Sequence, residues 1–226
     1  MRKCHINAEQ RMPACVSEIR SVNKEITDNY CRYLERQALC KSFGYDVEKE
    51  RDFILAAAAP IRGRIIEAGT GKGHFALALA KAGHSFVSFD ISAQEQYFSG
   101  LLLEYFGLRE RADLRIENGE RTSFPAGAFD TVFSVNVLHH LSNPYLVIDE
   151  LIRLVSPGGR LVLADFTPEG FKVMDKIHSL EGNVHETGKV GMAEAETYLV
   201  NMEFSLGKGS SVYQTVLVAG KSGGAS

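Results

Sequence analysis

The sequence lacks the features that mark membrane and secreted proteins. No stretch of roughly eighteen or more apolar residues occurs, so we expect no membrane span. The opening Met-Arg-Lys is not followed by an apolar stretch, so we expect no secretory signal. Together these absences predict a cytoplasmic protein with no membrane partner.

An excess of positive charge is also missing. Lys and Arg number 25 against 28 Asp and Glu, which leaves a formal net charge of −3 at pH 7. Because broad nucleic-acid binding needs a basic surface, we expect no nucleic-acid partner. The composition is that of an ordinary globular protein, and 226 residues leave room for one sizeable domain with a small extension.

Cysteine is scarce and confined to one end of the chain. All four, Cys4, Cys15, Cys31 and Cys40, lie in the first 40 residues, without C-x-x-C spacing or a close pair of histidines. We therefore expect reduced thiols in a helical arm and no metal site. A soft-metal site or a thiol pair is the alternative that this spacing leaves open.

The stretch from Arg64 to Asp90 is the most informative part of the chain. The apolar pair Ile65-Ile66 predicts a buried strand, and glycines at 69, 71 and 73 predict a tight turn. Helix-forming residues follow as far as Gly83, and a second apolar run ends on Asp90. A right-handed crossover then places the glycine turn beside Asp90 at the carboxyl edge of a parallel sheet.

This arrangement suits an adenosine-containing cofactor. Glycine lets the backbone approach a ligand, and a carboxylate ending the next strand can accept hydrogen bonds from both ribose hydroxyls. A P-loop is excluded because Gly73 stands where Ser or Thr is needed and Ile66 replaces its first glycine. The dinucleotide fingerprint fits poorly, since His74 stands where its last glycine is required. A turn that marks only a tight bend is the alternative.

Residues 1–59 are predicted to form a helical arm. Asp28 and Asp46 can cap two helices, and the second of these ends before Pro60. One interpretation is that the arm simply docks one apolar face on the core. The other is that it caps the cofactor, with Tyr30 or Tyr33 closing the site.

The rest of the chain continues the alternation of helices and strands. Periodicity predicts helices over about 93–106, 144–154, 171–180 and 192–200, strands over about 114–116, 129–136 and 161–166, and a hairpin of strands over about 204–206 and 212–218. A tight turn is expected at Ser156–Gly159, and Gly207–Ser210 is expected to connect the hairpin.

The segment after the predicted helix at 171–180 is rich in glycine. It is either a substrate lid that carries His178, His185 and Glu186 or a solvated surface loop. His139 and His140 are expected to end a strand at the ligand-binding edge. Each of these two histidines is interpreted either as a base or as a satisfied structural residue.

Several motifs in register resemble those of one enzyme family. They are Glu67-x-Gly-x-Gly-x-Gly73 with Asp90 at the next strand end, Phe129-Asp130 opening a strand, Val137-Leu-His-His-Leu141, and Pro157-Gly-Gly159. The chain resembles class I S-adenosylmethionine-dependent methyltransferases of the ubiquinone/menaquinone-biosynthesis type (methyltransferase type 11-like) from about residue 63 to 220. It departs from that pattern at Asn118, where the family carries an acid for the adenine amino group; an amide oxygen can still accept that bond.

The resemblance implies a fold and a domain division. The fold is α/β, a Rossmann-like doubly wound sheet of seven strands, mostly parallel with an antiparallel C-terminal hairpin, plus the N-terminal helical extension. Residues 60–226 would form the S-adenosylmethionine-binding domain and residues 1–59 the arm or cap. The reaction would be in-line displacement of a methyl group onto a small-molecule acceptor, by a monomer or homodimer.

The resemblance also implies a set of site residues. Residues expected to bind the cofactor S-adenosylmethionine are Glu67, Gly69, Thr70, Gly71, Gly73, Asp90, Ile91, Asn118, Gly119, Asn136 and Tyr30. Histidines proposed as a catalytic base are His139, His140 and His185. Methyl transfer needs alignment and exclusion of water more than acid–base chemistry, so a base is required only for a nucleophile that keeps its proton.

Two functions from other classes stay open on the sequence. One is an NAD-linked oxidoreductase on a similar sheet. The other is a non-catalytic cofactor-binding or scaffold protein in which the cysteine-bearing arm is the working part.

Overall fold

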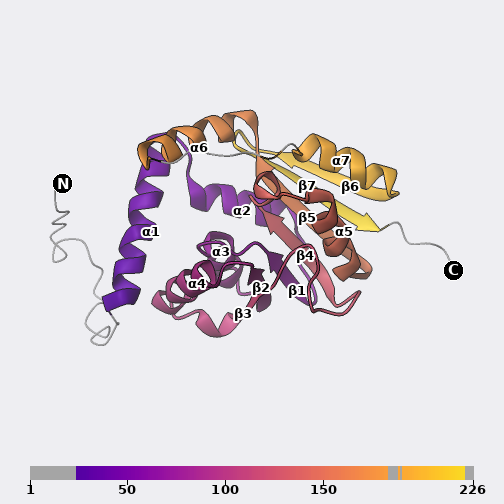
Figure 1. Ribbon diagram of the computed structural model, residues 1–226, viewed down its shortest axis with the longest axis horizontal. Coiled ribbons are helices and arrows are strands. Elements are labelled where there is room, and N and C mark those ends of the chain that lie inside the picture. Colours follow the sequence, from indigo (N-terminus) through magenta and orange to yellow (C-terminus); the bar gives the residue numbers. More distant parts are fainter. Residues whose placement is uncertain (1–23, 183–187, 189, 222–226) are drawn as a thin grey trace.

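The computed structural model describes residues 24–182, 188 and 190–221. Its centre is a seven-stranded sheet of order β3-β2-β1-β4-β5-β7-β6 (Figure 1). The strands are β1 Ile65–Ala68, β2 Phe86–Asp90, β3 Ala112–Ile116, β4 Phe129–Val135, β5 Val155–Phe166, β6 Phe204–Ser210 and β7 Gln214–Lys221. The first five run parallel, and β7 lies antiparallel to both β5 and β6, so the predicted Rossmann-like sheet is confirmed.

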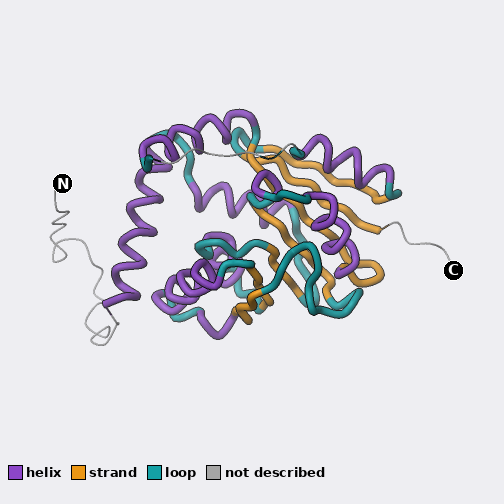
Figure 2. The backbone as a smooth tube through the Cα atoms, in the orientation of Figure 1, coloured by secondary structure: helices purple, strands orange, loops and turns teal. Residues whose placement is uncertain are grey.

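Helices cover both faces of the sheet, as the tube view shows (Figure 2). The helices are α1 Lys24–Ser42, α2 Val47–Ala57, α3 His74–Lys81, α4 Ala93–Tyr105, α5 Pro144–Leu154, α6 Pro168–Leu180 and α7 Met192–Asn201, with the short 3-10 turns η2 Arg109–Arg111 and η3 Leu138–His140. One core joins α2, α3 and α4 to the sheet, and a second joins α5 and α7 to its other face. No helix in the described ranges is long and apolar enough to cross a bilayer.

Alternation along the strands explains the two cores. In β4, Val132 belongs to the α5–α7 core and Phe133 to the α2–α4 core. In β5, Leu161 and Val162 divide in the same way. Because neighbouring side chains point to opposite faces, a central strand that is apolar at every position must be covered on both sides.

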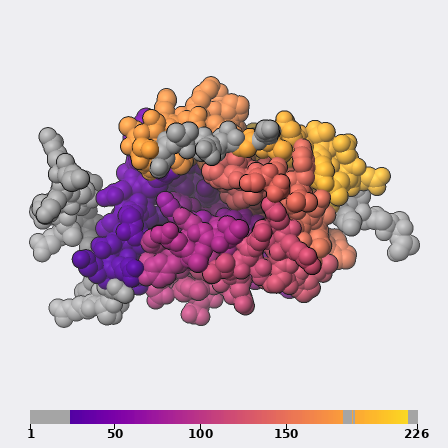
Figure 3. All heavy atoms as spheres, viewed as in Figure 1, coloured from indigo at the N-terminus to yellow at the C-terminus, as the bar shows by residue number. Residues whose placement is uncertain are grey.

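Helix α1 lies along one side of the molecule, between α4 and α6 (Figures 1 and 3). The Tyr30 ring stacks on Tyr105 of α4 with their centroids 3.6 Å apart. At the other end, Arg36 forms an ion pair with Glu181, just beyond α6. A third apolar cluster joins Cys40 of α1 to α2 and α6. Helix α1 is therefore anchored along its length to the rest of the fold.

The helix starts that the sequence predicted from capping residues are confirmed for α2 and α4. Asp46 caps α2, since its side chain accepts a hydrogen bond from the Lys49 amide, and Ser92 caps α4 in the same way. The expected start of the first helix at Asp28 was wrong, because α1 already includes Lys24.

Two expected turns were also wrong. Ser156–Gly159 lies inside β5 and Gly207–Ser210 inside β6. Phe129 of β4 pairs with Val155 and Thr131 pairs with Arg160, so residues 156–159 form an irregularity between these pairs, where Gly158 adopts a φ of 75°. The second segment pairs regularly with β7, so sheet pairing overrides the local turn signal of its glycines.

Candidate cofactor site

A cavity of about 480 Å³ lies at the carboxyl ends of β1, β2 and β4. It is bordered by residues from four loops that are distant in sequence. Sequence-predicted site residues on its wall are Gly69, Gly71, Asp90, Ile91, Asn118, Gly119, Asn136 and His140. Eight residues predicted from motifs that lie up to 71 positions apart thus border one space.

The three glycines of the turn have different surroundings. All adopt positive φ, which a side chain disfavours. A Cβ on Gly69 would lie 2.3 Å from Val137, and one on Gly73 would lie 2.5 Å from Ser99, so both are needed for packing inside the protein. A Cβ on Gly71 would meet no atom within 4 Å, since this residue faces the cavity. Gly71 is therefore the glycine that leaves room for a ligand.

Asp90 is held in place beside that turn. One carboxylate oxygen accepts a hydrogen bond from the Gly71 amide at 2.8 Å, and the other accepts one from the Ser92 amide at 2.9 Å. The turn itself is tied to the end of β2, because the amides of Gly69 and Thr70 both donate to the Phe89 carbonyl. The carboxylate thus borders the cavity in a fixed orientation.

Glu67 and Thr70 do not border the cavity; they lie behind the turn. Glu67 is only 1% exposed and accepts a hydrogen bond from the Ser88 hydroxyl at 2.6 Å. The Thr70 and Ser88 hydroxyls are 2.5 Å apart, and Gln96 donates to Thr70 at 2.9 Å. Burial raises the pKa of Glu67 to about 8, against the opposing effects of Ser88 and the positive charge of Arg51. This buried, hydrogen-bonded cluster packs behind the glycine turn and supports it.

The loop after β3 forms the opposite wall of the cavity. Asn118 folds it back, since its side-chain oxygen accepts a hydrogen bond from the Glu120 amide at 2.9 Å. Gly119 packs near Val147 of α5, where a Cβ would still find ordinary contact distance. Ile91 borders the same space with 71% of its surface exposed, so an apolar side chain is available to cover a flat ring.

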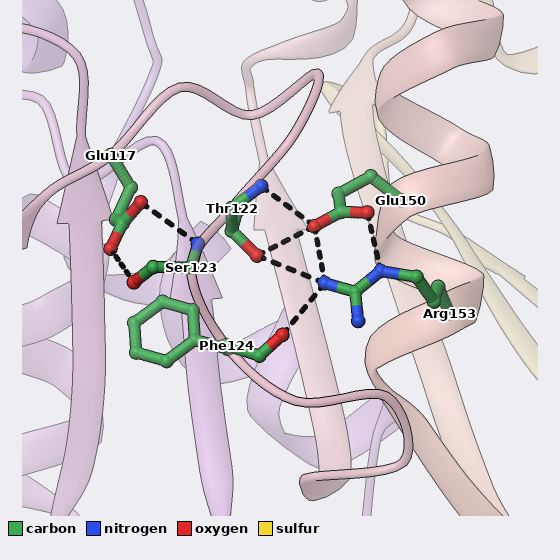
Figure 4. A network of polar contacts seen from close by, with 6 residues as sticks. All are labelled: Glu117, Thr122, Ser123, Phe124, Glu150 and Arg153. Atoms are coloured by element: carbon green, nitrogen blue, oxygen red, sulfur yellow. Dashed lines mark hydrogen bonds and ion pairs between the residues drawn. The ribbon is translucent and has the colours of Figure 1, made fainter.

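A buried polar network fixes this loop to α5 (Figure 4). The Thr122 amide and hydroxyl both donate to Glu150, at 2.7 and 2.6 Å. Arg153 donates to Glu150 at 2.6 Å and to the Phe124 carbonyl at 2.8 Å. The guanidinium of Arg153 holds the pKa of the Glu150 carboxyl down at about 2. The loop after β3 is thereby anchored on an ion pair that sequence reasoning missed.

Arg51 of α2, which sequence reasoning did not single out, contacts Asn136 on the cavity wall. Asn136 adopts a left-handed φ of 56°, and in the amide orientation that satisfies its neighbours its oxygen accepts bonds from Arg51 at 3.0 and 3.1 Å. The same amide donates to Gln214 at 2.9 Å. The Arg51 Nε atom is buried and has no hydrogen-bond partner among the described residues. A charged donor is therefore left unsatisfied next to the cofactor cavity.

A smaller cavity of about 340 Å³ adjoins Arg51 and is bordered by Tyr33 and His74. The His74 Nδ1 atom is also buried without a hydrogen-bond partner in the described part of the chain. Burial, with Arg51 second, lowers the pKa of His74 to about 3, so this imidazole is neutral. Tyr33, rather than Tyr30, borders this space. Tyr30 is not on the wall of the cofactor cavity and stacks on Tyr105 instead.

The histidines proposed as bases fall in different surroundings. His139 is 3% exposed and pairs with Asp165 of β5 at 2.7 Å, and Asp165 was not foreseen. His140 is exposed and borders the cofactor cavity. His185 and Glu186 lie outside the described residues, so the expected lid stays a prediction. His178 lies near the end of α6, where its ring is 4.0 Å from Glu181.

The cysteines do not form a cluster in the described part of the chain. Cys31 is exposed and Cys40 is buried between α1 and α6, while Cys4 and Cys15 lie outside the described residues. Within those residues, no group of three or more His, Cys, Asp or Glu side chains is placed to hold a metal ion.

Comparison with known proteins agrees with the sequence motifs. Residues 66–163 match the family model described as "Methyltransferase domain". The chain is 33% identical over 128 residues to demethylmenaquinone methyltransferase of Beutenbergia cavernae, covering 56% of this chain and 50% of that protein. It is 29% identical over 115 residues to 27-O-demethylrifamycin SV methyltransferase of Amycolatopsis mediterranei, covering 50% and 42%. The chain thus spans about half of the length of these relatives.

Solved structures share the fold. The magnesium protoporphyrin IX methyltransferase of Synechocystis PCC 6803, solved with bound S-adenosylhomocysteine, aligns with a TM-score of 0.57 at 24% identity. The alignment covers 78% of this chain and 82% of that one. The family match spans the glycine turn, Asp90 and β4, the same segments that carry the sequence resemblance. Residues 66–163 of this chain therefore match the methyltransferase domain family, and the chain has the Rossmann-like fold of the solved methyltransferase.

Proposed function

We propose that this chain binds S-adenosylmethionine and transfers its methyl group to a small-molecule acceptor. The observation that carries the proposal is the cavity in which the bare backbone at Gly71 and the carboxylate of Asp90 stand side by side. The relatives named as methyltransferases of a quinone precursor and of a rifamycin support a small-molecule acceptor. Methyl transfer requires alignment and exclusion of water, which such a cleft provides.

The nucleoside end fits the wall made by β2 and the loop after β3. Asp90 would accept hydrogen bonds from the two ribose hydroxyls, since its carboxylate already faces the cavity. The exposed side chain of Ile91 and the backbone of Gly119 would lie on the two faces of the adenine. Asn118 would meet the adenine amino group through its side chain or its backbone.

The methionine end fits the opposite wall. The backbone of the turn would bind near the amino group, and the buried carboxyl group of Glu67 lies behind it. The unsatisfied Nε of Arg51 is suited to the carboxylate, because guanidinium–carboxylate hydrogen bonds are among the strongest in proteins. Asn136, which already contacts Arg51, would orient that guanidinium.

Several further assignments are predictions from the sequence. Residues 1–59 are proposed as a cap and residues 60–226 as the catalytic domain. The protein is proposed to act as a cytoplasmic monomer or homodimer, without metal, membrane or nucleic acid. An NAD-linked oxidoreductase is the rival to test, although no observation in the cavity favours it.

Co-crystallisation with S-adenosylhomocysteine tests the proposal. We expect density for one molecule, with its ribose at Asp90, its adenine beside Ile91 and its carboxylate at Arg51. Parallel crystals grown with NADH should show no ordered dinucleotide. Density for NADH in this cavity, together with none for S-adenosylhomocysteine, would contradict methyl transfer and support an NAD-linked oxidoreductase.

A further inference from the structure

His139 and Asp165 form a buried pair across the ends of β4 and β5. The Nδ1 atom of His139 lies 2.7 Å from one carboxylate oxygen, which also accepts the Phe166 amide at 2.8 Å. The other oxygen accepts the backbone amide of His139 at 3.1 Å. The two side chains are 3% and 2% exposed, so the imidazole orientation is over-determined by packing and hydrogen bonds.

This geometry selects one tautomer of the imidazole. A carboxylate only accepts hydrogen bonds, so the neutral ring must carry its proton on Nδ1 and its lone pair on Nε2. An imidazole held in this way is an effective proton acceptor, because the carboxylate also stabilises the cation that forms. The pair therefore has the arrangement of a general base with its positioning carboxylate.

The pair lies next to the cofactor cavity. Val137, two residues before His139, fills the space above Gly69 of the glycine turn. The ring of His140, which borders the cofactor cavity, has its centroid 3.9 Å from that of His139. His139 also borders a neighbouring cavity of about 790 Å³, and the two cavities share the wall formed by residues 140–143. His139 thus borders a space in which an acceptor would lie beside the cofactor cavity.

The imidazole of His139 is buried among aromatic and ionisable side chains. Among the described residues, Asp165 of β5 and His140 of η3 are ionisable side chains in contact with its ring. Helix α6 contributes the edge of Phe171, at 5.2 Å between centroids, and the segment at Gly188 contributes a backbone amide that donates to the His139 carbonyl. In such a medium the carboxylate acts on the imidazole more strongly than it would in water.

We propose that His139, positioned by Asp165, is the general base of the methyl transfer, and that the acceptor is a small molecule bearing a hydroxyl group. This inference rests on the proposed function. Neutral amines attack without losing a proton first, and thiols ionise readily near neutral pH. A hydroxyl keeps its proton and gains most from a positioned base.

The step balances without any further reactant. His139 Nε2 takes the hydroxyl proton as the acceptor oxygen bonds to the methyl carbon. The carbon–sulfur bond breaks, and its electron pair stays on sulfur, which becomes a neutral thioether. The products are a methyl ether and S-adenosylhomocysteine, and the imidazolium then returns its proton to solvent.

The test compares three matched probes: 4-hydroxybenzoate, 4-aminobenzoate and 4-mercaptobenzoate, with methyl-labelled S-adenosylmethionine. We expect the wild-type protein to methylate the hydroxyl probe. In His139→Gln, kcat for this probe should fall about 100-fold or more, while the KM for the methyl donor stays unchanged. Asp165→Asn should lower kcat and shift the limb of the pH profile that reports the base. His84→Gln, at the amino end of β2, should match the wild type. Transfer to the amine alone, or full turnover by His139→Gln, would overturn the proposal.

Nitrogen-15 NMR tests the tautomer of His139 without any acceptor. We expect His139 to carry its proton on Nδ1, whereas a proton on Nε2 would overturn the proposal. Calorimetry with S-adenosylhomocysteine separates this inference from the proposed function. Variants that bind it normally but lose transfer implicate the base, whereas a wild-type protein that does not bind it contradicts the proposed function itself.

Discussion

Val137 occupies the space that a side chain at Gly69 would need: a Cβ there would lie 2.3 Å from the nearer Val137 methyl group. This contact joins the cofactor turn to the loop after β4. Gly69→Ala should therefore destabilise the fold by about 1–3 kcal/mol, from overpacking and positive φ together. Urea unfolding measures this loss.

Gly71→Ala is the matched control for that change. Gly71 also has positive φ, but no atom lies within 4 Å of the position a Cβ would take. We expect a stability loss of about 1 kcal/mol and a larger effect on cofactor affinity, because the methyl group would enter the cavity. Equal losses of stability in the two variants would contradict this division of roles.

Arg51 is predicted to carry much of the affinity for the methionine end. Arg51→Met should weaken S-adenosylhomocysteine binding about 10- to 100-fold, since a charge-assisted hydrogen bond contributes roughly 1.5–3 kcal/mol. Arg51→Lys should recover only part of the loss, because it restores the charge without the planar fork. Lys49→Met, an exposed position on the same helix, is the control. Normal binding by Arg51→Met would remove Arg51 from the site.

The buried carboxyl of Glu67 predicts a pH dependence of stability. Its pKa is about 8 in the folded protein and near 4.5 in the unfolded chain, so between these values only the folded protein holds the proton. The free energy of unfolding should therefore fall as pH rises from about 5 to 8, by up to about 1.4 kcal/mol per unit from this group. Glu67→Gln should remove that slope. Identical slopes in urea unfolding of wild type and variant would show that Glu67 is not protonated in the fold.

Glu150 predicts the opposite dependence. Arg153 holds the folded pKa near 2, so this group contributes stability above about pH 4.5, and the contribution is lost as pH falls towards 2. Glu150→Gln should destabilise the fold by about 1–3 kcal/mol at neutral pH and weaken cofactor binding, because the loop beside the adenine loses its anchor. Glu169→Gln breaks an exposed pair with Lys172 and should cost about 0.5 kcal/mol or less. Similar costs in both variants would contradict the anchoring role.

Sequence reasoning predicted what is encoded locally. Glycines at 69, 71 and 73, the caps at Asp46 and Ser92, and the alternation of strands and helices each act within a few residues. These signals predicted the parallel crossover that brings the glycine turn beside Asp90, because parallel strands bring their carboxyl ends together. The seven-stranded sheet as a whole was implied by the resemblance to the methyltransferase family.

The groups that the sequence did not reveal act across long separations. Arg51 reaches Asn136 from 85 positions away, and Asp165 reaches His139 from the next strand. Neither belongs to a periodic pattern, and an Arg on a helix is more often solvated than buried. Tyr30 and Tyr33 were equal candidates in the sequence, and only the packing of α1 on α4 separates them.

The central claim is that Asp90 binds the ribose of S-adenosylmethionine and its product. Calorimetric titration with S-adenosylhomocysteine tests it most directly, using wild type, Asp90→Ala, and Asp113→Ala as an exposed carboxylate on the neighbouring strand. The account predicts one-to-one binding by wild type and Asp113→Ala, and affinity at least about tenfold weaker in Asp90→Ala. Undetectable binding by the wild type, or equal affinity in all three proteins, would contradict it.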